Sequence, residues 1–264
     1  MTNSDIIDVL EQLSPPDGAL DWDNIGLLVG HRMQETDKVY VALDATDQVI
    51  DRAIGQGAGM LLTHHPMIFK GMKQVNDGDF MGRRILKLAE NRVACYAMHT
   101  NFDVWVMAQL AADRLDLQNR QVLDITGAKK SDEGEVLVGI GCTGNLTKPV
   151  SLEDCALAVK KAFHIPSVRI FGDKTKTVQR VSICPGSGKG MSAAAIRQGA
   201  DVLVTGDIGH HDGVDSVDQG LCIIDAGHHG IEHIFVPFMK EYLEKKLKGV
   251  EIIADDDEPP FTVI

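Results

Sequence analysis

The chain has 264 residues and a formal net charge of -12. That length suits one large domain or two of roughly 100–150 residues each, and a hydrophobic content of 44% is enough for a substantial core. The negative charge repels phosphate backbones, and only 5% of the residues are aromatic, so nucleic acid is disfavoured as a partner. No run reaches the ~20 apolar residues of a membrane span, and the first twenty residues lack Lys and Arg, so we expect neither a membrane anchor nor a leader peptide.

The cysteines indicate a reducing compartment. They are odd in number, scattered and never spaced as Cys-x-x-Cys: Cys95, Cys142, Cys155, Cys184 and Cys222. Most stand in apolar runs, which is typical of reduced core residues and not of a disulfide framework. We therefore expect a cytoplasmic protein with reduced thiols.

The first half of the chain alternates helices and strands. The apolar pattern predicts a first helix capped by Asn3 or Ser4, further helices that begin near residues 47, 80 and 105, and strands at 39–43, 60–62 and 93–98. Trp22 stands among Asp and Asn residues beside a glycine, which predicts a packed turn with the tryptophan as a buried anchor, and a direct role in a site is the alternative. This order of elements indicates a largely parallel sheet with helices on both faces.

The second half repeats this alternation after a polar stretch. Residues 126–135 are charged and lack an apolar period, and we expect a domain boundary there. Strands are predicted at 136–142, 168–171, 178–184, 201–205, 221–224 and 250–254, with helices at 152–163, 191–196 and 231–247. Pro237 is unfavourable inside the last of these helices, so its first turns are expected to be bent or separate.

One internal repeat is visible. Residues 53–63 align with residues 195–205, and seven of the eleven pairs are identical. In each copy a predicted helix ends at a glycine and a strand begins, and the strand ends in a polar pair. The repeat predicts a duplicated α/β unit, with related halves whose strand ends could face one cleft.

The strand at 60–62 delivers two adjacent histidines, His64 and His65, to its carboxyl end. Ligands bind at this end of the strands in parallel α/β sheets. Pro66 favours an extended backbone at His65, and neighbours on an extended chain point to opposite sides. Two metal ions side by side could therefore take one ring each more easily than one ion could take both. The alternative is a pair of surface histidines at a strand end.

Two further clusters follow predicted strands. His99 and Asp103 are four residues apart, as are His228 and Glu232 at a helix start, a spacing that places each pair on one helical face. Imidazole and carboxylate without thiolate suit divalent Zn, Fe, Mn, Co or Ni and are too rich in nitrogen for Ca or Mg. One such pair is usually structural, but three at strand ends favour a metal site.

A pair of metal ions has a definite chemical use. Ions roughly 3.5–4 Å apart can activate water, polarise a carbonyl or phosphoryl oxygen and orient a leaving group. Hydrolysis is therefore the default reaction class. Thr63, Thr205 and Asp225 stand close enough in sequence to the clusters to hold the ligand rings in place.

A fourth polar cluster contains Asp207, His210 and His211. By the internal repeat it corresponds to the His64-His65 position in the first copy. We interpret it as a candidate for substrate contact or proton transfer, and a plain polar loop explains it equally well.

The glycine-rich segment 185–190 lies between a predicted strand and a predicted helix, where backbone N–H groups can bind phosphate. It is not a Walker A loop, because Ile183 occupies the position of the first glycine and Gly190 that of the Ser or Thr. Lys189 is a candidate substrate contact, and a tight turn fits the segment as well as an anion site does.

Five short motifs occur in order across nearly the whole chain, at residues 22–30, 62–66, 99–103, 205–207 and 227–232. Together they resemble the dinuclear-metal proteins called GTP cyclohydrolase 1 type 2 homologues, or NGG-interacting-factor-like proteins. Each motif is short, but the combination is specific.

The resemblance implies an α/β fold of two related three-layer α/β/α lobes with a dinuclear metal site in the cleft between them. The last helix and strand would return to the first lobe, so that residues 1–125 and 226–264 form one lobe and residues 126–225 the other. Six chains would form a toroid. Longer members carry an extra domain in mid-chain, for which this sequence has no room.

The resemblance also implies a ligand set for two divalent ions. Motif position assigns two terminal ligands to each ion, one bridging carboxylate and one additional or outer ligand: His65 and Asp103 for the first ion, His64 and His228 for the second, Glu232 as the bridge and His99 as the outer ligand.

Three functions are compared. The first is a metal-dependent hydrolase of a small polar, nucleotide-like molecule, similar to the opening of a purine ring in the GTP cyclohydrolase reaction. The second is a non-catalytic metal carrier or regulatory ring. The third, a ring that threads nucleic acid, is weakened by the charge of -12.

Overall fold

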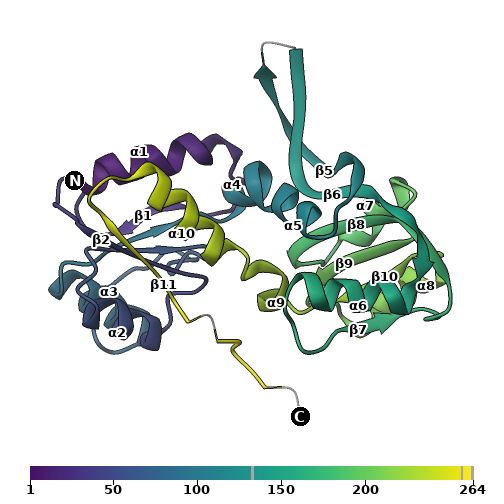
Figure 1. Cartoon of the computed structure of the whole chain (residues 1–264). Coiled ribbons are helices and arrows are strands. Elements are labelled where there is room, and N and C mark those ends of the chain that lie inside the picture. The colour runs from purple at the N-terminus through teal and green to yellow at the C-terminus, as the bar shows by residue number, and fades with distance from the viewer. Residues whose placement is uncertain (132–133, 257, 263–264) are drawn as a thin grey trace. The chain divides into compact units, whose positions relative to one another are not determined.

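The computed structural model describes residues 1–131, 134–256 and 258–262 (Figure 1). The chain divides into two compact units. The first comprises Met1–Phe102 and Phe235–Glu258, and the second comprises Asp103–Ile234 with the tail from Pro259. Each unit is built around its own sheet, which confirms the predicted α/β class.

The sheet of the first unit has the strand order β1-β4-β3-β2-β11. Its strands are parallel except β1, which pairs antiparallel with β4 at the edge. The strands are β1 (Gly26–Val29), β2 (Lys38–Ala42), β3 (Met60–Thr63), β4 (Ala94–Ala97) and β11 (Glu251–Ala254). The helices are α1 (Asn3–Leu13), the short η1 (Pro16–Gly18), α2 (Asp47–Gly55), α3 (Phe80–Glu90), the single turn α4 (Thr100–Phe102) and α10 (Phe235–Lys246).

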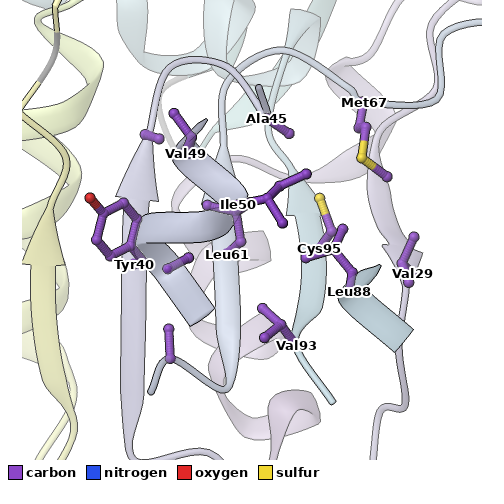
Figure 2. Close-up of a cluster of buried hydrophobic side chains, with 13 residues drawn as sticks. Val29, Tyr40, Ala45, Val49, Ile50, Leu61, Met67, Leu88, Val93 and Cys95 are labelled. Carbon is purple, nitrogen blue, oxygen red and sulfur yellow. The ribbon is translucent and has the colours of Figure 1, made fainter. Parts of the chain in front are cut away.

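Helices cover both faces of this sheet. On one face, Ile50 of α2 and Leu88 of α3 pack with Leu61 of β3 and Cys95 of β4 in a buried cluster (Figure 2). Helices α1 and α10 lie on the opposite side of the sheet (Figure 1) and bury their own apolar stripes. Both faces of the central strands β3 and β4 are therefore buried, and their ends are open to polar chemistry.

The sheet of the second unit has the order β5-β6-β8-β9-β10-β7. Its strands are β5 (Gln118–Ser131), β6 (Gly134–Ser151), β7 (Arg169–Phe171), β8 (Thr177–Ser187), β9 (Val202–Gly206) and β10 (Cys222–Asp225). Its helices are the π-helical turn η2 (Asp103–Met107), α5 (Ala108–Arg114), α6 (Leu152–Ala162), α7 (Met191–Arg197), α8 (His210–Asp218) and α9 (His228–Glu232).

The two units share one topology. Strands β8, β9 and β10 are parallel and β7 runs antiparallel at the edge, as β2, β3, β4 and β1 do in the first unit. In both copies the glycine after the helix, Gly57 or Gly199, takes a positive φ, of 71° and 69°. The next residue donates to the carbonyl five residues earlier at 3.0 Å in each copy. The predicted internal repeat is therefore a structural duplication, and it aligns His64-His65 with Gly206-Asp207.

The units divide at positions other than those implied by the family resemblance, which separated residues 1–125 and 226–264 from 126–225. Residues 103–125 belong to the second unit because β5 pairs with β6 and α5 packs on β6 and β8. Residues 226–234 belong to it because α9 packs on β8 and β9. The polar stretch 126–135 is no boundary: its described residues lie in the β5–β6 hairpin, and residues 132–133 lie outside the described part.

Several helix ends differ from the sequence prediction. Helix α1 is capped by Thr2, one residue earlier than expected, in a reciprocal capping box with Asp5. The predicted final helix is divided into α9 and α10, with Pro237 in the first turn of α10, as its fixed φ requires. Strands β1 and β5 and helix α8 were not predicted, because the four-residue β1 is too short to show a period and β5 and α8 are largely polar. Among the described residues, no helix is both long and apolar enough to cross a membrane.

All five cysteines are buried and free. Burial raises the pKa of the Cys95 thiol to about 12 and that of Cys155 to about 11. A thiol reacts as its thiolate, so neither should react near neutral pH in the folded chain. We expect Ellman's reagent at pH 8 to titrate none of the five rapidly in the native protein and all five in denaturant. Fast stoichiometric reaction of the folded protein would contradict this burial.

Candidate metal centre

Three histidines converge at the carboxyl ends of two neighbouring strands in the first unit. Thr63 of β3 is in register with Ala97 of β4, so the residues that follow both strands emerge at the same sheet edge. One ring nitrogen each of His64, His65 and His99 lies within 4.8 Å of the others. The three ring centroids are 4.9–5.6 Å apart, which is the spacing of imidazoles gathered around a common point.

Each of these rings is held through its Nδ1 atom. In every case the partner is an oxygen at 2.8–2.9 Å: Met98 O for His64, Asp44 Oδ1 for His65 and Asp23 Oδ1 for His99. A neutral imidazole that donates through Nδ1–H carries its lone pair on Nε2. The same arrangement orients metal-ligating histidines in known sites, where the outer oxygen fixes both tautomer and ring direction. All three rings are thus prepared to offer Nε2.

Asp23 anchors the turn beside His99. Besides the imidazole, its carboxylate accepts from the Thr100 N–H at 3.0 Å and the Thr100 hydroxyl at 2.5 Å. Burial alone would raise the pKa of Asp23, but the hydrogen bonds from His99 and Thr100 outweigh it and lower the pKa to about 2. The residue expected to anchor this turn, Trp22, is instead 58% exposed, so that prediction was wrong.

His64 is the most enclosed of the three rings, with none of its surface exposed. Its ring lies 5.2 Å from Phe235 and 6.1 Å from Phe102, and those two phenyl rings meet edge to face at 4.9 Å. These apolar neighbours fix the imidazole plane and keep water from one side of it.

The second unit gathers two carboxylates and an imidazole. Asp103 opens the π-helical turn η2, a local geometry that recurs at functional sites. Glu232 is only 3% exposed, and His228 Nε2 lies 2.9 Å from Glu232 Oε2 one helical turn apart. Carboxylate oxygens of Asp103 and Glu232 lie within 4.8 Å of one another. Two ionised carboxylates this close, one half-buried and one buried, repel, and a cation between them offsets that cost.

Asp207 orients His228. Its carboxylate lies 2.8 Å from His228 Nδ1, the counterpart of the Asp44 and Asp23 contacts in the first unit. Asp207 reaches the ring from a left-handed backbone with φ of 56°. The preceding Gly206 has no room for a side chain, because a Cβ there would lie 2.5 Å from the backbone nitrogen of His228. This contact positions the His228 ring, and the predicted substrate contact of Asp207 stays a prediction.

Asp225 fixes the two loops that carry these residues. Its carboxylate accepts from the backbone N–H of Ile208 at 3.1 Å and of Gly227 at 2.9 Å, and it pairs with Arg169. Asp225 thus acts on His228 through the backbone. In the first unit, the Thr63 hydroxyl donates to the His65 carbonyl at 2.9 Å and closes the turn after β3.

The glycine-rich segment 185–190 serves packing. Gly186 has φ of +80°, and a Cβ there would lie 2.2 Å from Glu232 Oε1 and 3.8 Å from His228 Nε2. A Cβ on Gly188 would lie 2.5 Å from the Thr205 hydroxyl. The segment therefore brings bare backbone against Glu232, and the tight-turn interpretation fits it better than the phosphate interpretation.

Some predicted site residues lie on the surface. Lys189 is exposed, and His210 and His211 are exposed at the start of α8 with ring centroids 5.2 Å apart. Their predicted role in substrate binding stays a prediction. Sequence reasoning missed Asp23, Asp44 and Gly186, although Asp44 directly follows the predicted strand at 39–43 and Asp23 stands in the predicted turn beside Trp22.

The donors in the two units fit divalent metal ions. They are imidazole and carboxylate groups from residues far apart in sequence, and in each unit outer oxygens hold the imidazoles by Nδ1. The buried thiol of Cys184 adds no ligand: burial raises its pKa, and the negative charges of Asp103 and Glu232 raise it further. These residues could bind metal through nitrogen and oxygen.

Comparison with known proteins identifies the family of the chain. A family model described as Duf34/NIF3 (NGG1p interacting factor 3) matches residues 1–260. The chain belongs to the Duf34/NIF3 family.

Relatives within the Duf34/NIF3 family cover the whole chain. A Clostridium acetobutylicum protein named GTP cyclohydrolase 1 type 2 homolog is 32% identical over 254 residues, which are 94% of this chain and 91% of that protein. A Clostridium perfringens protein of the same name is 31% identical over 271 residues, and the match covers 100% of this chain and 100% of that protein. The solved structure of a Bacillus cereus protein related to NIF3 has 25% identity and a TM-score of 0.92, with 100% of this chain and 99% of that one covered.

The hydrogen bonds that Asp23 accepts from His99 and Thr100 predict that the free energy of unfolding depends on pH. The pKa of this carboxyl is lowered from 3.8 to about 2 in the folded chain, so its stabilising contribution is present above pH ~4 and is lost as the pH falls towards 2. We expect Asp23→Asn to lower the free energy of unfolding by roughly 1–2 kcal/mol at neutral pH and by progressively less below pH 4. Urea unfolding at several pH values measures this, with the exposed Asp21→Asn as control. A deficit that does not change with pH would contradict the prediction.

Proposed function

We propose that this chain is a metal-dependent hydrolase of a small, nucleotide-like molecule, in which the two ligand sets share a pair of divalent ions. The observation that carries the proposal is the set of three imidazoles held by Nδ1, with one ring nitrogen of each within 4.8 Å of the others. A purely structural cluster would have no need to fix one tautomer in all three rings.

Chain connectivity supports a shared site. The chain passes from the first unit to the second between Phe102 and Asp103, directly after the His99 turn. It returns between Ile234 and Phe235, just after Glu232. Each set alone lacks ligands for two ions, since the first offers no carboxylate as a bridge and the second offers one imidazole. We propose the pairing implied by the family resemblance, with Glu232 as the bridge.

The ions, when bound, would supply Lewis-acid polarisation and water activation. The residues of the chain position them: Asp44, Asp23 and Asp207 keep the imidazoles in the ligating tautomer, and the apolar wall of Phe102 and Phe235 excludes water behind His64. The relatives' name points to a purine nucleotide as the substrate class. The alternative, a non-catalytic metal carrier or regulatory ring, would use the same ligands without turnover.

The wider biological setting is also a proposal. Five buried, free thiols support a cytoplasmic protein. The six-chain toroid rests on the family resemblance alone, and sedimentation velocity of the purified chain measures it. A monomer at micromolar concentration would remove the ring from the proposal.

Removing a ligand should remove metal and turnover together. Elemental analysis of protein purified without added metal, followed by a panel of purine nucleotides including GTP, gives the reference. We expect His65→Ala and Glu232→Gln to lose at least one ion per chain and all turnover, while His31→Ala, at an exposed position, retains both. Full metal loading in the Glu232 variant would defeat the site assignment. Stoichiometric metal without turnover of any substrate would favour the carrier.

Two glycines give a matched test of Glu232. Gly186 and Gly190 have nearly equal positive φ, +80° and +83°, so alanine costs similar backbone strain at both, about 1–2 kcal/mol. Only at Gly186 does the new Cβ meet Glu232, whereas nothing lies within 4 Å at Gly190. We expect Gly186→Ala to weaken metal binding more than tenfold in a chelator competition and Gly190→Ala to leave it within twofold. Equal affinities would show that Glu232 is not a ligand.

A further inference from the structure

Two exposed aromatic side chains stand beside the histidine cluster of the first unit. Trp22 is 58% exposed and Phe69 is 51% exposed, although aromatic residues are scarce in the chain. Their ring centroids are 5.7 Å apart, and His99 lies 5.9 Å from Trp22 and 6.1 Å from Phe69. Large apolar rings are costly to leave in water, so an exposed pair at a polar site indicates a ligand surface.

The pair sits on rigid supports. Asp23, next to Trp22, is tied to His99 and Thr100, and the Thr100 hydroxyl also accepts from the Leu20 N–H at 2.9 Å. The Asn24 amide donates to the carbonyl of Ile68, the neighbour of Phe69, at 2.5 Å and joins the two loops. A ligand that stacks here would pay little entropy to order the protein, because both loops are already fixed.

The distance and angle between the Trp22 and Phe69 rings limit how a flat ligand can stack on them. The planes of Trp22 and Phe69 are inclined at 42°, so neither ring covers the face of the other. A third ring between them would need roughly twice the ~3.5 Å stacking separation, and 5.7 Å is too little. The geometry therefore favours stacking on the exposed indole, with Phe69 as a buttress beside it.

We propose that Trp22 and Phe69 form an aromatic platform that binds the flat heteroaromatic ring of the substrate next to His99. This inference rests on the proposed function and assigns the residues that would bind the purine-size ring of its substrate. The platform consists of two side chains flanked by the charged Asp21 and Lys70, which suits one small ring better than the broad apolar face of a second chain.

Fluorescence measures binding without relying on turnover. The chain has two tryptophans, so Trp105→Phe leaves Trp22 as the sole indole. In that background we expect guanosine 5′-monophosphate to quench the emission saturably, and ribose 5-phosphate, which lacks the base, to cause no quenching. Equal effects of the two compounds would overturn the platform.

Calorimetric titration of the same nucleotide then assigns the residues. Base–aromatic stacking predicts that Trp22→Ala weakens binding roughly 5–100-fold and Trp22→Phe only a few fold, with metal content unchanged in both. Phe80→Ala is the control, because Phe80 is similarly exposed at 53% but belongs to α3.

Two outcomes separate this inference from the proposed function. Nucleotide binding that depends on Trp22 in a protein without turnover would leave the platform standing and remove the hydrolase. Turnover by the protein, together with a nucleotide affinity that Trp22→Ala does not change, would support the hydrolase and overturn the platform. A change of sedimentation coefficient in Trp22→Ala without loss of affinity would show that the pair is a contact between chains, and would overturn the platform.

Discussion

The hydrogen bond from an imidazole Nδ1 to an outer oxygen is the interaction on which the candidate centre depends. It occurs at His64, His65, His99 and His228, with a backbone carbonyl in one case and an aspartate in the other three. In each unit it fixes the ring and leaves Nε2 outside that bond, and in the second unit Nε2 of His228 lies 2.9 Å from Glu232 Oε2. Without these bonds the rings would rotate about χ2, and the convergence of ligand nitrogens would be lost.

The duplicated fold explains how the oxygens reach the rings. In each unit three parallel strands end at one edge, and the polar residues follow the last apolar residue of each strand. The first copy places the histidine pair after β3, whereas the second places Gly206-Asp207 at the equivalent position after β9. The same position of the repeat thus carries an imidazole pair in one unit and an orienting carboxylate in the other.

The type of most elements and the sheet edge that carries the polar residues could be predicted from local sequence. The contacts between residues distant in sequence could not. The strand before His64 is a continuous apolar run, and the repeat is visible as identical residues, so element type and edge were predictable. The role of Gly186 depends on Glu232, which is distant in sequence and meets it only in the fold. The exposure of Trp22 and the anchoring by Asp23 likewise depend on contacts with Phe69, His99 and Thr100, which no local pattern encodes. The unit boundary was missed because a hairpin exposed on both faces has no apolar period to identify it.

Zinc-loaded crystals measured on both sides of the zinc absorption edge test the central claim most directly, because anomalous scattering locates the metal without reference to the chain. The account predicts anomalous peaks about 2.0–2.1 Å from the Nε2 atoms of His64 and His65 while Nδ1 keeps its oxygen partner. Zinc bound through Nδ1, or found only at sites away from these rings, would contradict it.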